Sequence, residues 1–108
     1  MFRVVSIAFA VTALSAQTFN ARITGAILDS SQAAAPGAVI TAVRVDTQTK
    51  KTATSAASGE YSIPLLLPGV YEVTVEAPGF QTQTRRDVRL EINQTATLNL
   101  TLSPATTS

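Results

Sequence analysis

Apolar and polar residues alternate one by one along most of the chain beyond residue 20. The alternation is clearest in GVYEVTVEA (69–77), where Tyr71, Val73, Val75 and Ala77 fall on one face and Glu and Thr side chains on the other. A period of two is typical of a β-strand with one buried face, and no window outside the N-terminal segment keeps the helical period of 3.6. The same pattern predicts about seven short strands, at 21–29, 37–46, 50–57, 59–64, 69–77, 85–92 and 95–102.

Turn residues separate these segments and favour an all-β fold. Pro-Gly occurs at 36–37, 68–69 and 78–79, and Ser-Gly at 58–59, which are dipeptides that mark turns. Strands with one apolar face must be buried in pairs of sheets, so we predict a single Greek-key β-sandwich. Because proline cannot donate to a strand ladder, PLLLP (64–68) is predicted to cross between the sheets, with Leu65, Leu66 and Leu67 closing the end of the core. A ligand-binding patch of leucines is the alternative.

The first 16 residues have the pattern of a secretory signal peptide. Arg3 precedes an apolar run from Val4 to about Ala16, which is short for a membrane span and ends in small residues. We predict cleavage after Ala16, with Ser15 as the alternative because Leu14 is larger than the residue usual three positions before the cut. A buried N-terminal strand or helix is the other interpretation. The protein is therefore expected in the periplasm, at the outer membrane or outside the cell, with no membrane-spanning segment in its mature part.

The residue types in the chain limit the catalytic and metal-binding chemistry that it can perform. The chain has 108 residues, room for one domain. It has no histidine and no cysteine, so it lacks the commonest zinc ligands, the commonest general base and a thiolate nucleophile. Glu72 and Glu76 on one strand would lie about 13 Å apart, too far for an inverting glycosidase pair, which needs about 6.5–9.5 Å. We expect no enzyme, no cofactor and no metal site.

Charge is nearly balanced along the chain. The formal net charge is +1, and basic residues adjoin only at Lys50-Lys51 and Arg85-Arg86. A nucleic-acid or membrane-surface footprint would need a basic stripe, and the sequence contains no such run. We therefore expect no nucleic-acid partner.

Several short motifs follow one another in a fixed order: ITGAILD (23–29), PGA (36–38), TAT (52–54), GEY (59–61) and LLPGVYEVTVEAPGF (66–80). This series resembles the carboxypeptidase regulatory-like domain, especially the copies at the N-terminus of Oar-like TonB-dependent outer-membrane receptors. The resemblance implies a seven-stranded prealbumin-like sandwich at 20–103, classed with carbohydrate-binding-like folds, and a tail at 104–108. It implies no peptidase activity, because the histidine ligands of a catalytic zinc are absent. The loop SSQAAA (30–35) lacks the family's glycine, and Ser58 replaces the usual aspartate.

Two classes of function follow from the resemblance. The first is a non-catalytic accessory or interaction module of the bacterial cell envelope, either the N-terminal extension of a TonB-dependent receptor-like protein or a free-standing copy. Whether Ser108 is a natural C-terminus stays open. Its partner would be an envelope protein or the rest of a receptor chain, met through an outer strand edge or through loops 30–35 and 78–83. The alternative is a small carbohydrate-binding module.

Aromatic residues decide between these classes, because sugar platforms usually need exposed rings. Beyond the predicted signal peptide the chain has only Phe19, Tyr61, Tyr71 and Phe80. Tyr61 and Tyr71 lie on apolar faces of the pattern, so they are predicted to be core residues. Phe80 follows a Pro-Gly turn and is the candidate ligand-contact residue.

Overall fold

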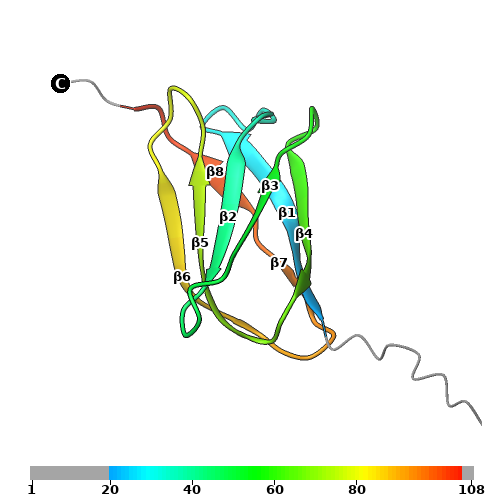
Figure 1. Cartoon of the computed structure of the whole chain (residues 1–108). Coiled ribbons are helices and arrows are strands. Elements are labelled where there is room, and N and C mark those ends of the chain that lie inside the picture. The colour runs from blue at the N-terminus through cyan, green and yellow to red at the C-terminus, as the bar shows by residue number, and fades with distance from the viewer. Residues whose placement is uncertain (1–19, 106–108) are drawn as a thin grey trace, which may run out of the picture.

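The computed structural model describes residues 20–105, which form eight strands in two facing sheets (Figure 1). The strands are β1 (Ala21–Asp29), β2 (Val39–Arg44), β3 (Lys50–Thr54), β4 (Glu60–Leu66), β5 (Gly69–Glu76), β6 (Gln83–Leu90), β7 (Thr95–Thr97) and β8 (Leu100–Leu102). The predicted all-β sandwich is confirmed. The predicted signal peptide, Phe19 and the last three residues of the predicted tail lie outside the described residues.

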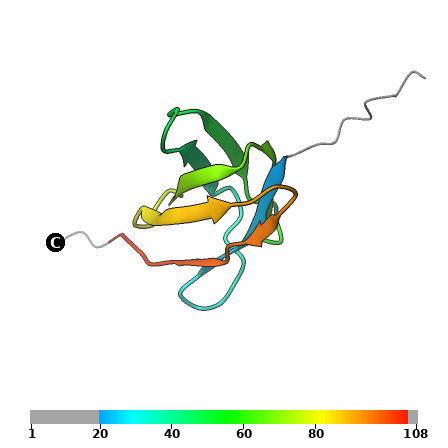
Figure 2. The same cartoon turned by 90° about the horizontal axis from the view of Figure 1, so that it is seen from below.

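Each sheet mixes strands that are distant in sequence. One sheet has the order β3-β2-β5-β6, and all its pairs are antiparallel. In the other sheet β1 is central, antiparallel to β4 on one side and parallel to β7 and β8 on the other. The chain therefore crosses from sheet to sheet after β1, β3, β4 and β6, and the two sheets enclose the core between them (Figure 2).

The core follows the period-two pattern. Tyr71, Val73 and Val75 of β5 are buried, as predicted, and so are Ile23 and Ile27 of β1. The largest fully buried side chains come from both sheets: Ile23, Ile27, Ile40, Ile63, Leu66, Val73, Val75, Leu90 and Leu102. Among the described residues, all the buried apolar side chains lie within 21–102 and form one core.

The last predicted strand (95–102) is two strands, which is why eight are found where seven were expected. Between β7 and β8, Leu98 and Asn99 leave the ladder, and the backbone of Leu98 passes directly over Gly25 of β1. The side-chain oxygen of Asn99 accepts a hydrogen bond from the Ala26 N–H (2.9 Å) and so supplies the acceptor that the ladder lacks there. Alternation continues across the gap, so the sequence pattern gives no sign of it.

The segment PLLLP was predicted as a crossing that closes the core, and this is wrong in part. β4 runs through Pro64 to Leu66, and only Leu66 is buried, while Leu65 and Leu67 are 61% and 54% exposed. β4 is an edge strand, so Pro64 has no ladder hydrogen bond to lose on its open side. Opposite Arg22, β4 contains an extra residue, and this bulge holds Leu65 at φ 60° with its side chain outward.

Ile92 also departs from the alternation in RRDVRLEI (85–92), which predicts that it shares a buried face with Val88 and Leu90. β6 ends at Leu90, and Ile92 is 57% exposed in the turn that follows. The Glu91 N–H donates to the side-chain oxygen of Gln94 (2.7 Å), which closes the turn. The strand thus stops before the alternation does.

The two ends of the sandwich are distinct. The start of β1 and the turns β2–β3, β4–β5 and β6–β7 lie at one end, named here the N-terminal end (lower in Figure 1). The turns β1–β2, β3–β4 and β5–β6 lie at the other, the C-terminal end, where the chain leaves β8. Ala21, where the first strand begins, and Leu102, where the last strand ends, therefore lie at opposite ends of the sandwich.

Candidate functional site

Phe80, the candidate ligand contact, lies in the β5–β6 turn at the C-terminal end. It is half-buried and packs against the core. Its backbone forms an isolated bridge with Pro104, and the neighbouring Gln81 N–H donates to the Ser103 carbonyl (2.8 Å). The turn is thus fixed to the segment after β8, and only part of the ring is open to a ligand. Its role in binding stays a prediction.

Tyr61 and Tyr71 are core residues, as predicted. The Tyr61 hydroxyl donates to the Leu98 carbonyl (2.7 Å) and the Tyr71 hydroxyl to the Leu67 carbonyl (2.6 Å). Burial raises the pKa of Tyr61 to about 12 and also raises the pKa of Tyr71. Both hydroxyls therefore stay protonated at neutral pH and anchor backbone turns, so neither ring is a stacking platform or a general base.

Asp29, another residue of the motif series, also serves the fold. Its carboxylate accepts hydrogen bonds from the Ser31 hydroxyl (2.6 Å), the Ser31 N–H (2.8 Å) and the Ala33 N–H (3.0 Å). These bonds, that of the Ser31 side chain first, lower its pKa. Asp29 therefore shapes the turn after β1.

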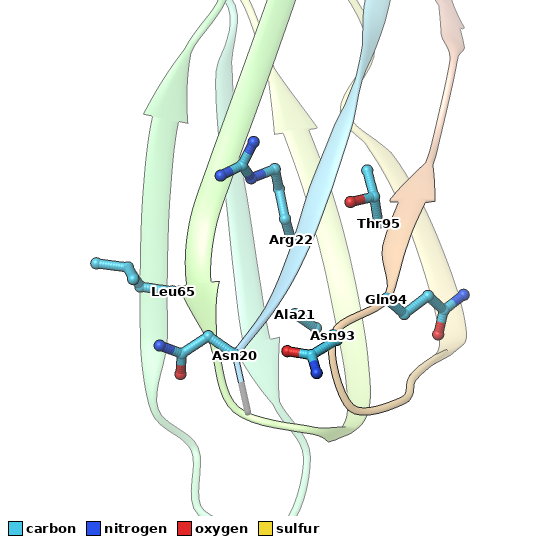
Figure 3. Close-up of a pocket in the computed structure, with 7 residues that line it drawn as sticks. All are labelled: Asn20, Ala21, Arg22, Leu65, Asn93, Gln94 and Thr95. Carbon is cyan, nitrogen blue, oxygen red and sulfur yellow. The ribbon is translucent and has the colours of Figure 1, made fainter. Parts of the chain in front are cut away.

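The N-terminal end has two hollows, one on each side of Leu65. The first, of about 390 Å³, is drawn in Figure 3 and is lined by Asn20, Ala21, Arg22, Leu65, Asn93, Gln94 and Thr95. Its polar groups are amides, one hydroxyl and one guanidinium, which suit hydrogen bonding to hydroxyl or anionic groups. None of its described lining residues is aromatic or acidic, so the hollow has neither a stacking ring nor a catalytic carboxylate.

The second hollow is smaller and more apolar. It has a volume of about 150 Å³ and is lined by Leu65, Leu66, Leu67, Tyr71, Thr49, Arg44 and Lys51. Arg44 Nε lies 3.0 Å from the Asp46 carboxylate, but their alignment does not make a hydrogen bond, so the contact is an ion pair only. Arg44 packs so close to Gly69 that a Cβ there would lie 2.7 Å from its Nε. The glycine of the Pro68-Gly69 turn thus makes room for the guanidinium.

Sheet edges offer little to an added strand. β3 is short and begins with two lysines, β4 has Pro64 and the Leu65 bulge, and β7 and β8 have three residues each. β6 is longer, but a bulge with Asp87 at φ 57° interrupts it, and it contains three arginines. Charges, proline and bulges are the usual devices that block edge pairing. Of the predicted contact regions, the strand edges are therefore the less suited.

Within residues 20–105, no three acidic, histidine or cysteine side chains are placed to hold a metal ion. No helix in the same range is long and apolar enough to cross a membrane. The polar and apolar linings of the two hollows at the N-terminal end make them candidate binding surfaces.

Fold and motifs together define a β-sandwich of the prealbumin-like, carbohydrate-binding-like class. Residues 22–103 match the family model of the carboxypeptidase regulatory-like domain, and the chain belongs to that family. It is 33% identical over 86 residues to the TonB-dependent transporter Oar of Myxococcus xanthus. That alignment covers 79% of this chain but 8% of the transporter, so the chain spans a small part of its curated relative.

Solved structures share the fold at low identity. A putative carbohydrate binding protein of Bacteroides uniformis is 21% identical, with a TM-score of 0.63 over 78% of this chain and 41% of that chain. Catechol 1,2-dioxygenase of Pseudomonas arvilla is 11% identical, with a TM-score of 0.64 over 83% of this chain and 54% of that one. A binding protein and an enzyme thus share this sandwich, and the fold alone assigns neither function.

Proposed function

We propose that this chain is an exported, non-catalytic accessory or interaction module of the bacterial cell envelope. It acts in the periplasm, at the outer membrane or outside the cell, as the N-terminal extension of a TonB-dependent receptor-like protein or as a free-standing copy of it. The observation that carries the proposal is the 33% identity to the Oar transporter over 86 residues. The organisation that goes with it is a signal peptide at 1–16, a domain at 20–103 and a tail at 104–108.

The roles of the motif residues support a module without catalysis. Gly25, Asp29, Tyr61, Gly69 and Tyr71 each support a turn, a crossing or a close approach of backbone. None of them lines a convergent set of nucleophile, base and oxyanion donors, which an acyl- or glycosyl-transfer site requires. As the partner of such a module we propose an envelope protein or the rest of a receptor chain.

The N-terminus of the exported protein tests the proposed location. We expect protein from the envelope or periplasmic fraction to begin at Gln17, or at Ala16 if cleavage follows Ser15, as read by N-terminal sequencing and intact mass. Val11→Arg, which places a charge in the apolar run, is the control and should leave the chain uncleaved in the cytoplasm. Soluble wild-type protein that keeps Met1 would contradict the proposal.

A carbohydrate-binding role is the second candidate, favoured by the polar hollow of Figure 3 and the similarity to the Bacteroides uniformis protein. Since neither hollow offers an exposed ring, we expect calorimetry of the chain from Gln17 against envelope polysaccharides to give no affinity tighter than millimolar. The same protein should hydrolyse no peptide or glycoside and bind no zinc.

Two variants identify the site if that expectation is wrong. Micromolar sugar binding that is lost on Phe80→Ala would establish the carbohydrate module with its site at the C-terminal end. Loss on Asn20→Ala instead would place the sugar in the hollow at the N-terminal end.

A further inference from the structure

The exposed apolar side chains of the domain gather at one end. Five large apolar residues are strongly exposed, and four of them, Val45, Leu65, Leu67 and Ile92, are at least half exposed and lie in or beside the turns of the N-terminal end. The fifth, Val39, begins β2 near the other end. The four come from three separate turns, which Figure 2 shows from below. Scattered exposed apolar residues are ordinary, but a cluster at one end indicates an interaction surface.

Leu65 has a backbone conformation that is unfavourable for a leucine. A leucine at φ 60° lies in the left-handed region that glycine and asparagine adopt more easily. Such strain is found mostly where function retains it. At this position the strained backbone directs a leucine to solvent, where neither the core nor a turn requires one.

Basic side chains, like the exposed apolar ones, are concentrated toward the N-terminal end. Arg22, Arg44, Lys50, Lys51 and Arg89 lie in the parts of their strands nearest the N-terminal end, whose turns contain Asp46 and Glu91. Two more carboxylates, Glu72 (level with Lys50 across β2) and Asp87, lie beside Arg85 and Arg86. Asp46 is paired with Arg44, and among the described residues no carboxylate lies within 4 Å of the other four basic groups. Asp29, Glu60 and Glu76 lie at the C-terminal end, whose turns contain no Lys or Arg. A chain of nearly zero net charge therefore has one basic end.

We infer that the N-terminal end of the sandwich binds reversibly to an anionic lipid surface. Apolar side chains on separate turns, with basic groups behind them, match the boundary between acyl chains and anionic headgroups. A lipid surface receives such side chains one by one, whereas a protein would have to complement each in shape.

Vesicle sedimentation tests the inference with the chain from Gln17 to Ser108, which keeps the whole core and removes the apolar run. We expect binding to vesicles of phosphatidylglycerol and phosphatidylcholine in equal parts, and about tenfold or more weaker binding to phosphatidylcholine alone. Lys50→Gln with Lys51→Gln should weaken binding to the anionic vesicles by about tenfold, and high salt should do the same.

The apolar part is tested by Leu65→Asn with Leu67→Gln. Asparagine adopts φ 60° more readily than leucine does. The hydrogen bond from the Tyr71 hydroxyl goes to the backbone carbonyl of residue 67, which the substitution keeps. The melting temperature of the variant should therefore be no lower than that of the wild type. Its vesicle binding should fall about tenfold or more. Val39→Thr, which removes an exposed apolar group outside the cluster, is the matched control and should bind as the wild type does.

Three results would overturn the inference. Absence of sedimentation with anionic vesicles at low salt would do so, and would leave the surface to a protein partner. Equal binding to both kinds of vesicle would exclude a role of the basic groups in binding. Unchanged vesicle binding of the folded Leu65→Asn, Leu67→Gln variant would exclude a role of the apolar side chains. All of these outcomes are independent of where the exported chain is cleaved, which tests the proposed function separately.

Discussion

Val73→Asp is expected to lower the stability of the domain by about 3–5 kcal/mol, a large share of the roughly 5–15 kcal/mol that holds such a domain folded. Val73 is fully buried in β5, between Ala42 of β2 and Arg85 of β6. An aspartate there loses its water without gaining a partner, and it removes apolar contacts from the centre of the core. Urea unfolding followed by circular dichroism measures the difference.

Thr74→Asp is the matched control, one residue further along the same strand. Thr74 faces away from the core, beside Thr41 and Thr84, so a carboxylate there stays hydrated. Glu72 and Glu76 lie on the same face and add some repulsion, so the cost should be about 1 kcal/mol or less. Equal unfolding midpoints for the two variants would show that the register of β5 is wrong.

Alternation of apolar and polar residues predicts burial correctly in some segments and wrongly in others, and the difference has a simple physical cause. In β5 one face meets the core along its whole length, so the pattern and the burial agree from Tyr71 to Val75. At Ile92 the alternation continues after the strand has ended in a turn. At Leu65, where the prolines of PLLLP indicated a crossing, the strand continues instead, and a bulge turns Leu65 outward and Leu66 inward. A side chain's face depends on local backbone geometry, and a sequence pattern records only the spacing.

The basic apolar end could not be predicted from the sequence for a different reason. Arg22, Arg44, Lys50 and Arg89 are far apart in the chain, and no basic run connects them. They meet because β1 and β3 begin at the end where β2 and β6 finish. A membrane footprint was expected to need a continuous basic run in the sequence, whereas the directions of the strands bring single basic residues together at one end.

Gly25 was recognised in the sequence only as a motif position, and the structure supplies its physical reason. A Cβ at residue 25 would lie within 3.0 Å of the backbone oxygen and carbon of Leu98, which cannot move as a side chain can. The same carbonyl accepts the Tyr61 hydroxyl, and the Leu98 N–H donates to the Thr24 carbonyl (2.8 Å). The glycine is therefore required by the crossing of the last strand over the first.

Gly25→Ala is accordingly expected to cost about 3 kcal/mol or more, because the methyl group must displace the Leu98 backbone and break its hydrogen bonds. Gly79→Ala is the control: Gly79 has φ 82° and nothing within 4 Å of an added Cβ, so only conformational strain of about 1 kcal/mol is expected there. The melting temperatures of the two variants distinguish the loss of stability caused by steric contact from the loss caused by backbone conformation. If Gly25→Ala melts as high as Gly79→Ala, the close passage of Leu98 over β1 is wrong, and so is the division of the last strand into β7 and β8.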